Sequence, residues 1–189
     1  MSAFNVLIVG IGGQGVILAS NVIGEACIAD GIPVRCSETH GMAQRGGSVE
    51  SHVRIDGRFS PLIPPGMADV ILAFELLEAL RYRHYLHPGG TLLVNDHLII
   101  PTSVYAQKLP LPSRDDVVER LGTAHIVDAR RIALEAGSPL TLNIVMVGAA
   151  SPFLPLQPAS LEEGVRRWVP PKTIEMNKKA FELGKNAVG

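Results

Sequence analysis

Two stretches of the chain carry residue types whose spacing could do chemistry. In the first, Gly10-Ile11-Gly12-Gly13-Gln14-Gly15, three glycines have the spacing G-x-G-x-x-G. This turn follows an apolar run at 4–9 and precedes an apolar helix pattern at 16–30. Glycines between a strand and a helix let the backbone approach a phosphate, so the pattern predicts nucleotide binding. The alternative is a tight turn that only brings the helix close to the sheet.

The second stretch, residues 38–47, is polar and rich in glycine. Glu38 stands where the acidic partner of a ribose is expected. Arg45 can bind a phosphate or carboxylate through two hydrogen bonds, or form an ion pair with Glu38 or a partner chain. His40 can transfer a proton or bind a substrate, but no carboxylate or nucleophile at fixed spacing supports catalysis. We therefore assign no catalytic residue, and the candidate ligand or interface residues are Gly10, Gly12, Gly13, Gln14, Gly15, Glu38, Thr39, His40, Gln44, Arg45, Gly46 and Gly47.

The sequence lacks the residue patterns that several other chemistries need. No histidine or cysteine spacing predicts a metal site, and there is no serine elbow or P-loop lysine. The two cysteines, Cys27 and Cys36, are expected to be buried thiols. An iron–sulfur cluster needs about four thiolates, so this chain cannot hold one alone. Asn95 and Asp96 end a core strand and either face the same crevice as the glycine turn or satisfy their own turn.

Composition and charge narrow the classes of function. Of 189 residues, 47% are hydrophobic and 19% are charged, which predicts one globular domain spanning 1–189. The net charge of −1 gives no electrostatic reason for binding nucleic acid or a membrane surface. No signal-peptide pattern or apolar run of membrane-spanning length occurs, so we expect a cytoplasmic protein.

The pattern of elements predicts an α/β fold: a doubly wound, Rossmann-like, mostly parallel sheet with an antiparallel hairpin addition. Strands 4–9 and 32–36, joined by helix 16–30, should be parallel. Residues 49–55 alternate, and Asp56-Gly57 predicts a hairpin that returns at 58–63. Other strands are expected at 68–74, 91–94 and 124–127, with short ones at 97–100 and 104–109. Helices are expected at 75–85, 113–121, 129–136, 138–150, 161–169 and 173–187.

Together, the two stretches resemble the gamma-type subunit of 2-oxoacid:ferredoxin oxidoreductases. The Gly-Gly-Gln-Gly turn and the Arg-Gly-Gly segment are general to that family. The form Glu-Thr-His-Gly-Met-Ala-Gln is similar to the arylpyruvate branch, the small (beta) subunit of the indolepyruvate type. The length and the segments 77–80 and 88–90 also fit, so the resemblance covers nearly the whole chain.

The resemblance implies a complex that oxidatively decarboxylates an arylpyruvate such as indolepyruvate, forms an acyl-CoA and passes electrons to ferredoxin. Thiamine diphosphate, magnesium, iron–sulfur clusters and coenzyme A then belong to the large catalytic subunit or the assembled complex. This chain would bind no cofactor and would be inactive alone. In isolation it could form a homodimer. Its two stretches would approach the coenzyme A side of the site or contact the large subunit.

Two alternatives remain. Within the family, the chain can be the gamma subunit of a pyruvate, 2-oxoglutarate or branched-chain 2-oxoacid ferredoxin oxidoreductase. From another class, it can be a stand-alone dinucleotide-binding protein that uses the glycine turn and Glu38.

Overall fold

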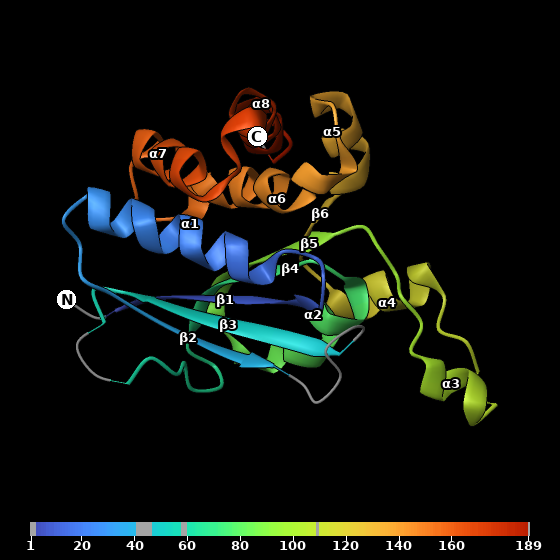
Figure 1. Cartoon of the computed structure of the whole chain (residues 1–189). Coiled ribbons are helices and arrows are strands. Elements are labelled where there is room, and N and C mark those ends of the chain that lie inside the picture. The colour runs from blue at the N-terminus through green and yellow to red at the C-terminus, as the bar shows by residue number, and fades with distance from the viewer. Residues whose placement is uncertain (1–2, 41–46, 58–59, 109, 189) are drawn as a thin grey trace.

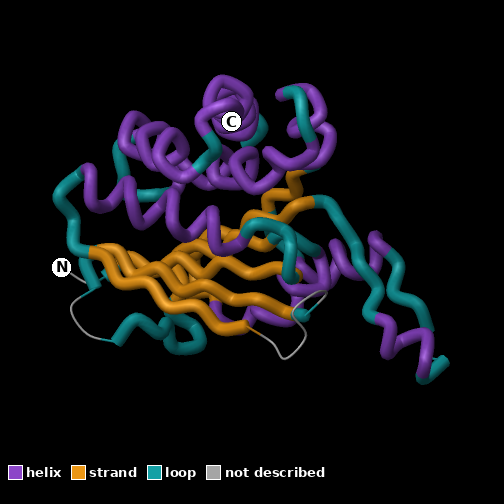
Figure 2. Tube along the Cα trace, in the orientation of Figure 1, coloured by secondary structure: helices purple, strands orange, loops and turns teal. Residues whose placement is uncertain are grey.

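A six-stranded sheet forms the centre of the molecule (Figures 1 and 2). The computed structural model describes residues 3–40, 47–57, 60–108 and 110–188. The strand order is β2-β3-β1-β4-β5-β6. The strands are β1 (Phe4–Ile11), β2 (Val34–His40), β3 (Ser48–Ile55), β4 (Ala68–Ala73), β5 (Leu86–Asn95) and β6 (His125–Val127).

Eight α-helices are found within the described residues, and short 3-10 turns join several of them. The α-helices are α1 (Val16–Ala29), α2 (Leu76–Tyr82), α3 (Thr102–Ala106), α4 (Arg114–Leu121), α5 (Ala129–Ala136), α6 (Leu142–Ala150), α7 (Pro158–Trp168) and α8 (Ile174–Lys185). The 3-10 turns are η1 (Arg83–Tyr85), η2 (Pro139–Thr141), η3 (Ser151–Phe153) and η4 (Pro171–Thr173). None of these helices combines the length and the hydropathy needed to span a bilayer.

All strands except β3 run in the same direction. β4 pairs in parallel with β1 and β5, and β5 pairs in parallel with β6. β3 is antiparallel to both of its neighbours, β1 and β2. The predicted fold class is therefore confirmed. β1 and β2 point the same way, as predicted, but β3 lies between them.

The antiparallel pair is β2–β3, and residues 60–63 of the predicted return strand at 58–63 are not a strand, while 58 and 59 lie outside the described residues. Among the described residues of that segment, the backbone bonds to side chains of β3 instead of forming a ladder. The Ile63 amide donates to His52 Nδ1 at 3.1 Å, and Arg54 Nη1 donates to the Ser60 carbonyl oxygen at 2.7 Å. Prolines in this segment lack the amide hydrogen that a ladder needs.

Helices cover both faces of the sheet. α1 and α5–α8 pack on one face, above the sheet in Figure 1, while α2 and α4 pack on the other. α3 stands away from the body (Figure 1) and occupies part of the predicted strand at 104–109. Residues 97–100 are likewise not a strand. Cys27 is buried as predicted, but Cys36 is exposed because β2 is an edge strand.

The backbones of α6 and α8 touch through two glycines. A Cβ on Gly148 would lie 2.1 Å from the carbonyl oxygen of Phe181, and one on Gly184 would lie 2.1 Å from that of Val145. Such distances exclude any side chain, so α8 fixes the position of α6 against the sheet.

Candidate functional site

The glycine turn is held at the carboxyl end of β1 by its own backbone and by Gln14. The Gln14 amide donates to the Ile11 carbonyl oxygen at 3.1 Å, and Gln14 Oε1 accepts from the Ile11 amide at 2.7 Å. Gly15 is the N-cap of α1, with φ of 84°, a left-handed conformation that favours glycine. The turn therefore has a defined structure, and it places the first backbone amides of α1 beyond the carboxyl end of β1.

Two side-chain amides fasten the strand ends together. Gln14 Nε2 and Asn95 Nδ2 both donate to the Phe74 carbonyl oxygen, at 3.4 and 3.1 Å. Asn95 Oδ1 accepts from the Ala129 amide at 3.2 Å. Gln14 and Asn95 thus connect β1, β4 and β5 at the point where the sheet changes winding direction.

Asn143, on α6, lies directly against Gly15 of the glycine turn. A Cβ on Gly15 would lie 2.4 Å from Asn143 Nδ2. The Asn143 side chain is buried, and its Oδ1 accepts from the Ile144 amide at 2.9 Å. Sequence reasoning missed this residue. The signal was present, because Asn143 is a polar side chain in an otherwise apolar or small-residue helix.

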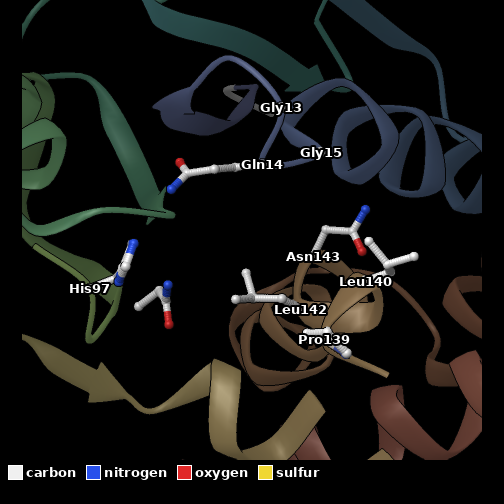
Figure 3. A pocket seen from close by; sticks show the side chains of 9 residues that line it. Gly13, Gln14, Gly15, His97, Pro139, Leu140, Leu142 and Asn143 are labelled. Carbon is white, nitrogen blue, oxygen red and sulfur yellow. The ribbon is translucent and has the colours of Figure 1, made fainter. Parts of the chain in front are cut away.

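A crevice of about 250 Å³ lies between the glycine turn and the start of α6 (Figure 3). Figure 3 shows Gln14 and His97 on one side of it and Leu140 and Asn143 on the other. The lining residues are Gly13, Gln14, Gly15, Asn95, His97, Pro139, Leu140, Leu142 and Asn143. The crevice sits beyond the carboxyl ends of parallel strands, where ligands bind in open α/β sheets.

The second stretch lies on the strand side of the turn. His40 pairs with Val49, which pairs with Gly10, so β2 and β1 end at the same level. The Gly12 amide donates to the Gly47 carbonyl oxygen at 2.9 Å, which joins the turn to the end of that stretch. Gln44, Arg45, Gly46 and the side chain of His40 lie outside the described residues.

Glu38 and Thr39 are on β2, not in a loop as expected. Both are exposed, and Glu38 Oε1 accepts a long hydrogen bond of 3.5 Å from Ser20 Oγ on α1. Because β3 separates β1 from β2, the backbone of Glu38 is about 10 Å across the sheet from β1. In a dinucleotide-binding fold β2 adjoins β1, so the predicted ribose geometry is not reproduced.

Two buried glutamates, Glu75 and Glu78, lie close to Ser48 at the start of β3. Glu75 caps α2 by accepting from the Glu78 amide at 2.9 Å, and burial raises the pKa of its carboxyl group. Glu78 accepts from Ser48 Oγ and from Arg81 Nη1, each at 2.5 Å.

The described residues contain no group of three histidine, cysteine or acidic side chains placed to hold a metal. Asp96 pairs with Arg114 at 2.7 Å and does not line the crevice.

The sheet and its crevice define a Rossmann-like α/β domain with an inserted antiparallel strand. The family model described as pyruvate ferredoxin/flavodoxin oxidoreductase matches residues 5–187, and the chain belongs to this family. The chain is 43% identical to indolepyruvate oxidoreductase subunit IorB of Thermococcus kodakarensis, over 99% of this chain and 96% of that protein.

Two further comparisons place the chain among subunits of related enzymes. It is 32% identical to 2-oxoglutarate synthase subunit KorC of Methanothermobacter marburgensis, over 96% of this chain and 94% of that protein. The crystal structure of a keto/oxoacid ferredoxin oxidoreductase gamma subunit from Geobacter sulfurreducens superposes with a TM-score of 0.72. It is 29% identical and covers 98% of each chain. The predicted family and its gamma-type fold are confirmed.

Proposed function

We propose that this chain is the small subunit of an indolepyruvate-type 2-oxoacid:ferredoxin oxidoreductase and has no activity alone. The observation that carries the proposal is its higher identity to an indolepyruvate oxidoreductase subunit than to a 2-oxoglutarate synthase subunit, along nearly the full chain. The Glu-Thr-His-Gly-Met-Ala-Gln segment points to the same branch.

The redox cofactors are assigned to the large subunit. Thiamine diphosphate with magnesium supplies the decarboxylation chemistry, iron–sulfur clusters carry electrons to ferredoxin, and coenzyme A accepts the acyl group. The thiols of this chain support that division. There are only two, and burial raises the pKa of Cys27 to about 12, so it is a poor thiolate ligand.

The glycine turn and residues 38–47 are the surface that we assign to the large subunit, next to its coenzyme A. The Gly12–Gly47 hydrogen bond supports this assignment, because it joins the two stretches at one sheet edge. Exposed Glu38 and Thr39 extend the same surface along β2. The role of this chain is then to complete and position a site whose reacting atoms lie in its partner.

The test is reconstitution with the large subunit. The purified chain alone should not reduce ferredoxin, and adding the large subunit should give reduction that depends on indolepyruvate and coenzyme A. Pyruvate, 2-oxoglutarate and branched-chain 2-oxoacids serve as competing substrates. Equal activity of the large subunit without this chain would contradict the proposal, and preference for another 2-oxoacid would favour the alternative within the family.

Arg45 tests the proposed surface. Arg45→Ala should weaken assembly or raise the KM for coenzyme A about tenfold, because an arginine on a carboxylate or phosphate contributes about 1.5–3 kcal/mol. Arg130→Ala, at an exposed position of α5, is the matched control and should change neither. Sedimentation measures assembly, and unchanged assembly and kinetics would exclude a role for Arg45.

A further inference from the structure

Residues 97–113 form an arm that joins β5 to α4 and leaves the body of the molecule (Figure 1). The structure describes all of the arm except residue 109. Its central helix, α3, has five residues and packs extensively on no other described helix or strand. A helix of this length is unstable alone in water, because its first turn fixes many backbone angles for few hydrogen bonds. α3 therefore gains stability from any surface that covers it.

The base of the arm is fixed at both ends. Asp96, just before the arm, accepts from Nε and Nη2 of Arg114, just after it, each at 2.7 Å. The Ile99 amide donates to Oε1 of the buried Glu75 at 2.7 Å. An arginine that makes two hydrogen bonds to one carboxylate has a restricted geometry, so this pair holds the two ends of the arm together. The base of the arm is thus in place before any partner binds.

The exposed part of the arm is apolar. Tyr105 and Leu111 are 59% and 56% exposed, and Lys108 carries the one formal charge in the sequence 97–113 with histidine neutral. Three prolines in this sequence restrict its backbone, which lowers the entropy that is lost when the arm is covered. The centres of protein interfaces are poor in charge and rich in aromatic residues. The arm therefore has the composition of a surface that another protein covers.

The arm continues the surface that we assign to the large subunit. β1, β2 and β5 run in the same direction, so the glycine turn, residues 38–47 and the arm all leave one edge of the sheet. Ile99 and Pro101, near the base of the arm, line a hollow of about 110 Å³. Ile11, in the glycine turn, and Ser48, which follows residues 38–47, line the same hollow. A partner that covers the two stretches therefore also meets the arm.

We propose that the arm docks on the large catalytic subunit, with Tyr105 and Leu111 as its main contacts. This inference rests on the proposed function and adds to the interface a part that the two stretches do not supply. A second copy of this chain is the other partner that an apolar arm can take. The shared hollow favours the large subunit, because that subunit is already assigned to the edge that Ile11 and Ser48 occupy.

The experiment measures by sedimentation how tightly the full chain binds the separately purified large subunit, and then the ferredoxin reduction of the complex. The double variant Tyr105→Ala, Leu111→Ala should bind at least tenfold more weakly, because it truncates the exposed apolar side chains of the interface. When the double variant is saturating, kcat should equal that of the unmodified complex, because the arm holds the partner and contacts no reacting atom.

The double variant Ile28→Ala, Leu134→Ala is the matched control. These residues are 63% and 56% exposed on α1 and α5, outside the arm. The control should bind the large subunit like the unmodified chain. Unchanged affinity of the arm variant, or an equal loss of affinity in the control, would overturn the proposal.

Hydrogen exchange tests the same proposal without any variant. The amides of residues 102–108 should exchange rapidly in the isolated chain and be protected in the complex. If the unmodified chain does not bind the large subunit, the proposed function itself fails. If the complex forms and reduces ferredoxin while these amides stay unprotected, the docking of the arm alone is wrong. Self-association of the isolated chain that the arm variant abolishes would assign the arm to a second copy and would also overturn the proposal.

Discussion

The two sides of the glycine turn are built in opposite ways. On the crevice side, the turn faces α6, whose buried Asn143 touches Gly15 and whose position is fixed by glycine contacts with α8. On the strand side, it faces β2 and β3, which carry exposed and charged residues such as Glu38. The crevice side is lined by no Asp, Glu, Lys or Arg among the described residues, and the strand side carries exposed charged residues on β2.

This difference separates two functions that a glycine-rich turn can serve. A crevice with neutral lining suits a small ligand, because side chains such as Gln14 and Asn95 are held in place before a ligand arrives. An exposed, charged strand edge suits a protein partner, because charges there steer association and select the partner. The turn is shared, so the two functions can be tested by changing one side at a time.

The largest effect is expected where α6 meets α8. Gly148→Ala places a methyl group 2.1 Å from the Phe181 carbonyl oxygen, so the helices must separate, which should cost about 3 kcal/mol of unfolding free energy. Chemical denaturation measures this change. Gly24→Ala on α1 is the control, because its Cβ would meet only Cys36 Sγ at 3.6 Å and should be neutral or slightly stabilising. Equal stability of the two variants would refute close contact between α6 and α8.

Next is the turn itself, where two glycines have positive φ but different surroundings. Gly13→Ala, with φ of 100° and nothing within 4 Å of the new Cβ, should cost about 1–2 kcal/mol from backbone strain alone. Gly15→Ala adds a collision with Asn143 and should cost about 1 kcal/mol more. A double-mutant cycle with Asn143→Ala should recover that excess. Additive effects would show that Gly15 and Asn143 do not interact.

On the strand side, His52 should make stability depend on pH. Burial lowers its pKa from 6.5, so below about pH 6.5 the unfolded chain binds a proton that the folded chain does not. Unfolding free energy therefore falls as pH decreases through this window, down to the folded pKa. His52→Asn keeps an acceptor for the Ile63 amide but cannot titrate, and it should flatten the curve. If unfolding free energy depended on pH equally in the unmodified chain and the variant, His52 would not be the cause of that dependence.

The smallest effect is expected at Glu38. Glu38→Ala removes an exposed side chain with one long hydrogen bond, so unfolding free energy should change by less than about 0.5 kcal/mol. Calorimetry should detect no NAD binding by either protein, because Glu38 is too far from the turn for ribose recognition. Micromolar NAD affinity that disappears in the variant would instead support a stand-alone dinucleotide-binding protein.

Local sequence patterns predicted most elements of this fold, because the periodicity and capping residues of a helix or strand lie within the element itself. Residues 129–136 were predicted as a helix and form α5 with the same bounds, and Ser113 caps α4 as expected by accepting from the Asp116 amide. The insertion of β3 could not be predicted in this way. Its alternation fits any half-buried strand, and its pairing with β1 joins segments more than 35 residues apart, so only the whole fold selects it.

The same distinction applies to the site. The glycine spacing identified the turn, since G-x-G-x-x-G is a local pattern with a known geometry. Gln14 was predicted to contact a ligand or an interface; it lines the crevice, and its side-chain amide also bonds to Ile11 and Phe74. Asn143 escaped detection because nothing near it in the sequence shows that it meets Gly15, more than 120 residues earlier.

The position of β3 also sets the order in which the protein can fold during synthesis. Residues 1–47 contain β1, α1 and β2, yet in the native sheet neither strand pairs with the other. Among the described strands, β2 pairs only with β3, and β1 pairs with β3 and β4. Ribosomes add about 5–20 residues per second, so the emerging β1 waits several seconds for β4. During that interval β1 can contact α1 and then pair with β3, but its other edge stays unpaired until β4 is made.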